Sequence, residues 1–291
     1  MLKEIVTPLL SWYDENKRTL PWRDRHNAYY TWVSEIMLQQ TRVEAVKPYF
    51  ERFISELPDI SSLAVCPEEK LMKLWEGLGY YSRVRNMQEA AKTVEKEYNG
   101  KLPEDFEALL SLKGIGSYTA GAIASIAYGI PVPAVDGNVL RVISRITESR
   151  EDIGKAAVKR KTEKLLEEIM PKDRPGDFNQ ALMELGAVIC IPNGQAKCLV
   201  CPVSGKCLAC RNHTVEEIPV KAPKKPRVVE ERTVFVIQDG AATAILKRPD
   251  KGLLAGLYEL PNTLGYMEQE EAVSYVKNMG LEPLYLSLIH I

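Results

Sequence analysis

The sequence lacks any apolar run long enough to cross a bilayer. Its least polar stretch, residues 120–135, is interrupted by glycines and prolines before it reaches the roughly 20 apolar residues that a spanning helix needs. The first ten residues include Lys3 and Glu4 but neither the apolar segment nor the small-residue cleavage site of a signal peptide. We therefore expect a cytoplasmic protein.

A large net charge is also missing. The formal net charge of −1 argues against the strongly basic surface of many nucleic-acid binders. The charge is unevenly distributed, however, because residues 249–285 contain two cations and six carboxylates, a local balance of −4 that leaves +3 for the remainder. This surplus is compatible with a local phosphate-binding face.

A disulfide framework is not expected, because the cytosol keeps thiols reduced. Of the six cysteines, Cys66 stands alone and five lie within residues 190–210. Seven, two and five residues separate the first four of that group, which are Cys190, Cys198, Cys201 and Cys207. Four thiolates so closely spaced can hold either zinc or a 4Fe-4S cluster, and the spacing alone leaves both open.

The hydrophobic pattern divides the chain into two parts. Apolar residues between positions 5 and 183 recur at helical spacing, which predicts a compact bundle of short helices. Helix starts are expected at Asp59, after Pro67, and after Pro103. After residue 229, two β-rich runs at 232–238 and 242–247 flank Asp239 and Gly240 as in a hairpin, and 268–279 has a helical pattern.

These patterns give the domain organisation. We expect a helical domain at 1–212 that includes the cysteine loop 190–210, a proline-rich linker at 213–228, and a small α+β unit at 229–285. That unit is too short to complete a core, and the string LSLIHI at 286–291 is what a common sequencing adaptor encodes. We therefore expect a truncated chain with a non-native tail at 286–291.

A glycine turn stands between two predicted helices. Gly114 and Gly116 allow a sharp reversal, and with Ser117 at the start of the next helix they present backbone N–H groups to an anion such as a phosphate. A plain turn between packed helices is the alternative. Asp136 follows Pro133 and is predicted to cap the next helix, where it would stay ionised and stabilise a developing cation.

The hairpin with an aspartate 20 positions after Gly116 resembles the helix-hairpin-helix DNA glycosylase superfamily. The resemblance implies a mainly α fold with a 4Fe-4S cluster loop. Relatives of endonuclease III have a Schiff-base lysine where Tyr118 stands here, and no lysine occurs between Lys113 and Lys155. We therefore expect a monofunctional glycosylase.

Two further segments narrow the resemblance. The runs LPWR at 20–23 and SEIMLQQT at 34–41 resemble adenine DNA glycosylases of the MutY type. Glu35 lies near Trp32 and Leu38 at helical offsets, so apolar contacts are expected to raise its pKa toward neutrality. An ordinary solvated helix glutamate is the alternative.

The resemblance implies base excision repair of adenine mispaired with 8-oxoguanine or guanine in double-stranded DNA, by a monomeric, bacterial-type, nucleoid-associated enzyme that flips the base. Glu35 would protonate the purine and Asp136 would stabilise the sugar cation, with Tyr118 and Asn138 orienting the two carboxyl groups. An adenine pocket would be lined by Arg18, Trp22, Leu38 and Gln180. Gln40 would fill the vacated space, Thr41 and Leu78 would contact the oxidised guanine, and Tyr80 would wedge beside it.

Two other inferences follow from the same family. The cluster loop ordinarily has six residues where this chain has seven between Cys190 and Cys198, which makes Cys210 a possible substitute ligand. Its cations Lys197, Lys206 and Arg211 favour contact with the DNA backbone. Residues 246–261 resemble a MutT-like (Nudix-like) domain without the glutamate-rich helix of a hydrolase, which implies recognition.

Two alternatives to adenine excision remain open. One is a DNA-binding or scaffold protein that retains the fold but removes no base. The other is a thymine-excising mismatch glycosylase of the same fold, although thymine has no imidazole nitrogen for Glu35 to protonate.

Overall fold

The computed structural model describes residues 2–23, 27–192, 194–223, 226, 228–249 and 251–284. The chain forms two compact units, Met1–Pro223 and Lys224–Ile291. The first unit is helical and the second contains short strands and one helix, so the mainly α fold class is confirmed. Among the described residues, no helix combines the length and apolar character needed to cross a membrane.

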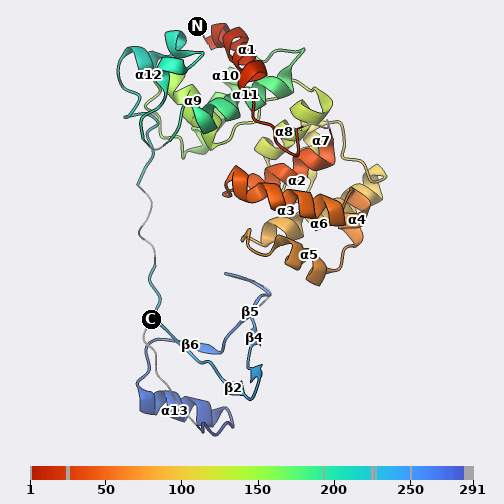
Figure 1. Ribbon diagram of the computed structural model, residues 1–291, viewed down its shortest axis with the longest axis vertical. Helices are drawn as coiled ribbons and strands as arrows, with labels where there is room; N and C mark the ends of the chain where they lie inside the picture. Colours follow the sequence, from red (N-terminus) through yellow and green to blue (C-terminus); the bar gives the residue numbers. More distant parts are fainter. Residues whose placement is uncertain are drawn as a thin grey trace. The chain divides into compact units, whose positions relative to one another are not determined.

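The first unit is built from helices joined by short turns (Figure 1). In chain order they are η1 (Leu2–Ile5), α1 (Val6–Asn16), α2 (Ala28–Leu38), α3 (Val43–Glu56), α4 (Ile60–Val65), α5 (Glu68–Trp75), α6 (Ser82–Tyr98), α7 (Phe106–Ser111), α8 (Ser117–Tyr128), α9 (Gly137–Thr147), α10 (Ala156–Glu167), α11 (Pro175–Val188), η2 (Cys198–Val200), η3 (Ser204–Lys206) and α12 (Leu208–Arg211).

Short polar side chains fix several of the helix starts. Asp59 accepts a 2.8 Å hydrogen bond from the Ser62 amide at the start of α4, and Asp105 accepts one of 2.7 Å from the Ala108 amide at the start of α7. Each carboxylate satisfies an amide that has no partner within its own helix. The predicted start after Pro67 is correct, whereas α7 begins two residues later than the Pro103 signal suggests because Asp105 is its cap.

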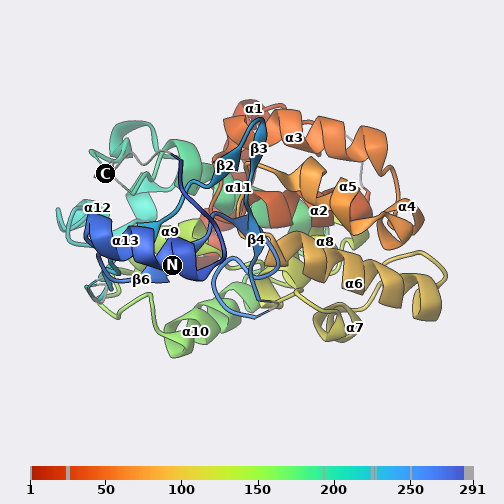
Figure 2. The ribbon, with the colours of Figure 1, turned by 90° about the horizontal axis from the view of Figure 1, so that it is seen from below.

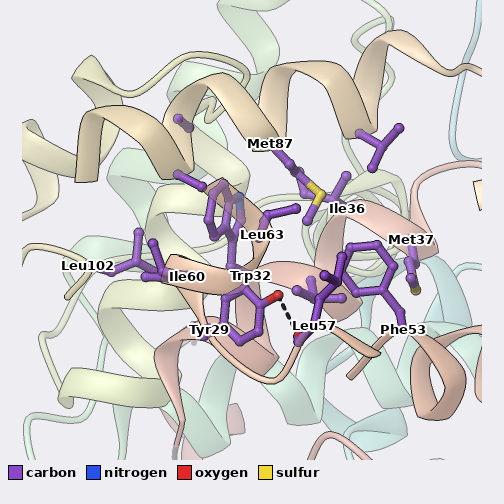
Figure 3. Packing of buried hydrophobic residues seen from close by; sticks show 14 of the residues in the cluster. Tyr29, Trp32, Ile36, Met37, Phe53, Leu57, Ile60, Leu63, Met87 and Leu102 are labelled. Carbon is purple, nitrogen blue, oxygen red and sulfur yellow. Dashed lines mark hydrogen bonds between the residues drawn. The ribbon is translucent and has the colours of Figure 1, made fainter. Parts of the chain in front are cut away.

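Two hydrophobic cores make up the first unit. The first core lies among α2–α8 and contains Trp32, Phe53 and Trp75, each fully buried. Figure 3 shows its packing, in which the Tyr29 hydroxyl donates a 2.9 Å hydrogen bond to the Leu57 carbonyl. A buried hydroxyl with a partner avoids the cost of leaving water unpaired.

The second core contains residues from both the N-terminal and the C-terminal helices of the first unit. It packs η1 and α1 against α9 and α11 and also includes part of the cysteine segment. Figure 1 shows α1 beside α11, and Figure 2 shows α3–α7 at one end of the unit with α10 and α12 at the other. The chain therefore starts in the second core, leaves it to build the first core, and returns at Val135.

A buried asparagine holds the segment by which the chain returns. The Asn179 amide nitrogen donates to the Ser125 hydroxyl at 2.8 Å and to the Val132 carbonyl at 2.9 Å. Its oxygen accepts a 3.0 Å hydrogen bond from the Ala134 amide. Because three elements depend on one fully buried side chain, the backbone that leads to Asp136 is fixed.

The predicted linker differs from the observed structure in its first part. Ile218 is fully buried in the second core, and its carbonyl accepts a 2.7 Å hydrogen bond from Arg145. The Val220 carbonyl accepts a 3.1 Å hydrogen bond from the Ile153 amide. Proline-rich composition predicts extended backbone, which this segment has, but extended backbone can still be held by donors from α9 and from the loop that follows it.

The second unit has β1 (Arg232–Val234), β2 (Gln238–Asp239), β3 (Ala242–Thr243), β4 (Leu246–Lys247), β5 (Tyr258–Glu259), β6 (Asn262–Leu264) and α13 (Gln269–Asn278). The strands pair antiparallel as β1 with β6, β2 with β3, and β4 with β5. The predicted hairpin is present as β2–β3, and α13 lies within the predicted helix. Its most completely buried apolar side chains are those of Phe235, Ala272 and Val276. The predicted non-native tail at 286–291 lies outside the described residues.

Gly121 provides a test of the helix packing. An added Cβ on this α8 residue would lie 2.2 Å from the Pro133 carbonyl oxygen, three residues before Asp136. Gly121→Ala is expected to lower the free energy of unfolding by about 1–3 kcal/mol, measured by urea denaturation. Gly205→Ala is the control, since a Cβ there meets nothing within 4 Å. Equal stability of the two variants would contradict this packing argument.

Candidate active site

An open cleft of about 1420 Å³ lies between the two cores of the first unit. One wall comes from α2 and α8, and the other from α9, α11 and the extended segment that follows the cysteine loop. Ten of the residues predicted from the sequence line it, namely Arg18, Trp22, Glu35, Leu38, Gln40, Thr41, Tyr118, Asp136, Asn138 and Gln180. The fold therefore brings together residues that lie up to 162 positions apart.

Glu35 lies on α2 with its side chain almost completely buried. Burial raises the pKa of its carboxyl to about 7, and the nearby Asp136 charge adds to that rise. The hydroxyl of Tyr118, on α8, donates a hydrogen bond to Glu35 Oε2 and opposes part of the shift. The carboxyl can consequently hold or release a proton near neutral pH, which suits a general acid.

Asp136 is the N-cap of α9. Its Oδ1 accepts a 2.7 Å hydrogen bond from the Val139 amide, and its Oδ2 accepts one of 2.7 Å from the Asn138 side chain. Burial raises the pKa of Asp136, while these hydrogen bonds act in the opposite direction. The cap predicted from the sequence is present, but the raised pKa shows that burial works against the fully ionised state that a helix cap alone implies.

Arg141 fixes the orientation of the Asn138 amide. Its Nη2 donates to Asn138 Oδ1 and to the Gly186 carbonyl, each at 2.8 Å, and its Nε donates to the Cys190 carbonyl at 2.8 Å. With Oδ1 engaged, the Asn138 amide nitrogen points at Asp136. The spacing of three between Asn138 and Arg141 on one helix is the sequence signal for this contact, which was not among the predictions.

Glu184 is a further buried carboxylate of the cleft, which the sequence did not predict. It is fully buried on α11 and forms ion pairs with Arg18 and, at 2.7 Å, with Arg23. Burial raises the pKa of Glu184, but the two guanidinium groups outweigh that effect, so the net shift is downward. Glu184 lies four residues after Gln180, and this spacing on one helix face could have revealed it.

The other predicted DNA-contact residues lie outside the lining of this cleft. Leu78 is buried against the first core, whereas Tyr80 is 63% exposed. The predicted contacts of both residues with the bases stay predictions. Gly114 has φ +81°, and Gly116 is the N-cap of α8, so the predicted sharp turn between α7 and α8 is present. Ser117 accepts a 2.9 Å hydrogen bond from Lys159 and donates one of 3.0 Å to Glu163.

Five cysteines line a separate, small cavity of about 20 Å³. They are Cys190, Cys198, Cys201, Cys207 and Cys210, and apolar side chains of α9 and α11 complete the lining. Arg145 donates a 3.3 Å hydrogen bond to the Cys190 sulfur. Among the residues that the structure describes, no three or more His, Cys, Asp or Glu side chains converge closely enough for one metal ion. Five thiols around one cavity are a donor set that either a zinc ion or a 4Fe-4S cluster can use.

Residues 33–168 match the family model of the HhH-GPD superfamily of base excision DNA repair proteins, the class that the hairpin and the carboxylate-lined cleft define. A solved structure with a similar fold is that of a thermostable thymine-DNA glycosylase. It has a TM-score of 0.64 and 28% sequence identity, and the match covers 72% of this chain and 96% of that one.

Relatives of known name show which family of this superfamily the chain belongs to. The chain is 40% identical to an adenine DNA glycosylase of Arabidopsis thaliana, over 93% of this chain and 49% of the relative. It is 36% identical to an adenine DNA glycosylase of Buchnera aphidicola subsp. Schizaphis graminum, over 97% of this chain and 83% of the relative. The chain belongs to the adenine DNA glycosylase family, as its motifs predict. It spans 49% to 61% of the length of the plant and mammalian relatives that it matches.

The raised pKa of Glu35 predicts a pH-dependent stability difference. Folding binds a proton on Glu35 between its ordinary pKa of 4.5 and about 7, so its contribution to stability is full below pH 4.5 and is lost as the pH rises through 7. Glu35→Gln is therefore expected to gain stability relative to the wild-type protein between pH 5 and pH 8, measured by urea denaturation. If the difference in the free energy of unfolding between Glu35→Gln and the wild-type protein does not vary with pH, the raised pKa of Glu35 is contradicted. The exposed Glu107→Gln on α7 is the control.

Proposed function

We propose that this protein hydrolyses the N-glycosidic bond of adenine mispaired with 8-oxoguanine or guanine, as a monofunctional, base-flipping glycosylase. The observation that carries the proposal is the pair of carboxyl groups in one cleft, of which Glu35 has a pKa of about 7. The substrate is double-stranded DNA, and a monomer contains both carboxyl groups.

The chemistry requires an acid and a stabiliser of positive charge. Adenine is a poor leaving group as an anion, so Glu35 transfers a proton to an imidazole nitrogen of the purine as the glycosidic electron pair moves onto the base. Because Tyr118 donates to Oε2, the proton lies on Oε1. Asp136 stabilises the oxocarbenium-like sugar, and water then completes hydrolysis to an abasic site and free adenine.

Substrate binding follows from the lining of the cleft. Arg18, held by Glu184, and Trp22, Leu38 and Gln180 form the adenine pocket. Gln40 fills the space that the base leaves, Thr41 contacts the opposite guanine, and Tyr80 wedges into the stack. The hairpin residues Gly114, Gly116 and Ser117 contact the DNA backbone at the N-terminus of α8.

Among the described residues that line the cleft, the one lysine is Lys221, which lies on the extended segment after the cysteine loop and not at the hairpin. Tyr118 occupies the position of the Schiff-base lysine in the bifunctional enzymes, and its hydroxyl is hydrogen-bonded to Glu35. Burial raises the pKa of Tyr118 well above its ordinary value, so the phenol stays protonated and orients Glu35. This supports simple hydrolysis without strand cleavage.

The second unit supports a recognition role. It contains the hairpin β2–β3 and helix α13, and its residues 246–261 resemble a MutT-like domain. The glutamate-rich magnesium helix of a hydrolase is absent from the sequence. We propose recognition of the oxidised base as the contribution of the complete domain, and a boundary with the helical domain within 213–228.

Asp136→Asn tests the reaction. The variant keeps an acceptor for the Val139 amide, and so the helix cap, but it removes the negative charge and the acceptor of the Asn138 amide. Adenine release is therefore expected to fall by about 10²-fold or more while DNA binding remains. The assay is single-turnover excision on an adenine:8-oxoguanine duplex, with binding measured on the same duplex. Equal rates for the variant and the wild-type protein would overturn the role of Asp136.

The same assay separates the alternatives. A binding protein without excision would bind the duplex and release no base from the wild-type chain. The fold neighbour that is named a thymine-DNA glycosylase makes a guanine:thymine duplex the relevant comparison. We expect adenine release only, because Glu35 has no imidazole nitrogen to protonate on thymine.

We also propose that Cys190, Cys198, Cys201 and Cys207 hold one 4Fe-4S cluster with a structural role, and that Lys197, Lys206 and Arg211 place the loop against the DNA backbone. The support is the cavity that these cysteines line. Cys210 lines the same cavity, so it is close enough to replace one ligand.

The cofactor proposal predicts a coloured protein. The purified chain is expected to show a broad visible absorption band with about four iron and four sulfide per chain, and Cys201→Ser is expected to lose most of it. Cys66→Ser, which lies in the first core, is the control that keeps the band. A colourless protein that contains zinc would show that the cluster assignment is wrong.

A further inference from the structure

One guanidinium group joins the two loops that carry Gln40 and Tyr80. Arg83 lies in the first turn of α6, and its Nη1 donates to the carbonyls of Ile36 at 2.6 Å and Gln39 at 2.7 Å. Its Nη2 donates to the carbonyls of Leu78 at 3.0 Å and Gly79 at 3.2 Å. The first pair of carbonyls belongs to the end of α2 and the second to the loop between α5 and α6.

Both loops contain a non-glycine residue in the left-handed region. Gln40 has φ +63° and Tyr80 has φ +45°. Such residues cost about 1–3 kcal/mol each and persist only where surrounding contacts fix them. Arg83 supplies such contacts for both loops, since it also lies 5.8 Å from the centroid of the Tyr80 ring and 5.4 Å from that of Trp75.

Backbone carbonyl groups, and not a carboxylate, accept the hydrogen bonds of the Arg83 guanidinium group. Among the described residues no carboxylate pairs with it, and backbone carbonyls accept its hydrogen bonds instead. Its buried Nε has no hydrogen-bond partner. A cation with an unsatisfied buried donor is a poor means of stabilising a fold, whereas a planar fork of donors is well suited to fixing a distance between two loops.

We propose that Arg83 is a positioning residue for engagement of the mispair. It sets the spacing of Gln40 and Tyr80 before DNA binds, so that both side chains enter the duplex as one preformed unit. This inference rests on the proposed function, in which Gln40 and Tyr80 contact the bases around the extruded adenine. Preformed geometry matters because a misplacement of about 1 Å can cost about 10²-fold in rate.

Arg83→Lys is the informative substitution, because an ammonium keeps the charge but cannot span carbonyls of two loops with a planar fork. Arg85→Lys on the same helix is the matched control, since Arg85 is paired with Glu68 at the surface. Without DNA, amide hydrogen exchange is expected to quicken together in residues 37–42 and 77–81 of Arg83→Lys only. Unchanged exchange in both loops would overturn the inference.

The wild-type protein provides a measurement that needs no variant. In the absence of DNA, the Arg83 Nη–H groups are expected to give slowly exchanging signals in the ¹⁵N spectrum, because carbonyls already hold them. Rapid exchange of these protons with water would show that the clamp is not preformed, and the proposal would fail.

DNA binding provides the functional readout. The probes are a duplex with a non-hydrolysable 2′-fluoro adenosine opposite 8-oxoguanine and a fully paired duplex of the same sequence. Arg83→Lys is expected to weaken mispair binding about 10- to 100-fold and to leave binding of the paired duplex unchanged. Gln40→Ala should then cost less in the Arg83→Lys background than in the wild-type protein, because the two side chains act together.

The outcomes separate the two proposals. A wild-type protein that binds both duplexes equally contradicts the proposed function. A wild-type protein that prefers the mispair, with Arg83→Lys showing the same preference, contradicts only the role of Arg83. Equal loss of mispair and paired binding in Arg83→Lys assigns the residue a general structural role and also overturns the inference.

Discussion

The burial of one carboxyl group, Glu35, is the constraint on which the rest of the site depends. A glutamate within a helix surrounded by apolar residues is unfavourable when charged, and the protein uses that cost to raise its pKa to about 7. The hydroxyl of Tyr118 keeps the side chain in one orientation. These two residues come from α2 and α8, which both pack in the first core, so the acid is part of a rigid support.

The second carboxyl group comes from the other core. Asp136 is held by the start of α9, and Asn138 and Arg141 extend that support to the cysteine loop through the Cys190 carbonyl. Glu184 on α11 forms ion pairs with Arg18 and Arg23, which lie in the segment between α1 and α2. Buried ion pairs and hydrogen-bonded amides thus fix the walls of the cleft where apolar packing alone would not determine side-chain direction.

Backbone strain has a comparable role in the loops that follow α2 and α5. Gln40 and Tyr80 adopt left-handed conformations that L residues avoid, and Arg83 fixes the loops of both. Helices of the first core therefore fix Glu35 and Tyr118, whereas hydrogen bonds from Arg83 fix the loops that contain Gln40 and Tyr80.

The sequence by itself determined the helical class, the cap at Asp136, the raised pKa of Glu35 and the clustering of the cysteines, because helix periods, capping residues and short spacings are local. It also contained the motifs that identify the family. Only the tertiary structure revealed Glu184, Arg141 and Arg83 as supports, showed Leu78 to be buried, and extended the helical unit through Ile218. Those facts depend on partners far apart in the chain, and no local pattern specifies which distant carbonyl or carboxylate a guanidinium group will meet once two cores close around a cleft.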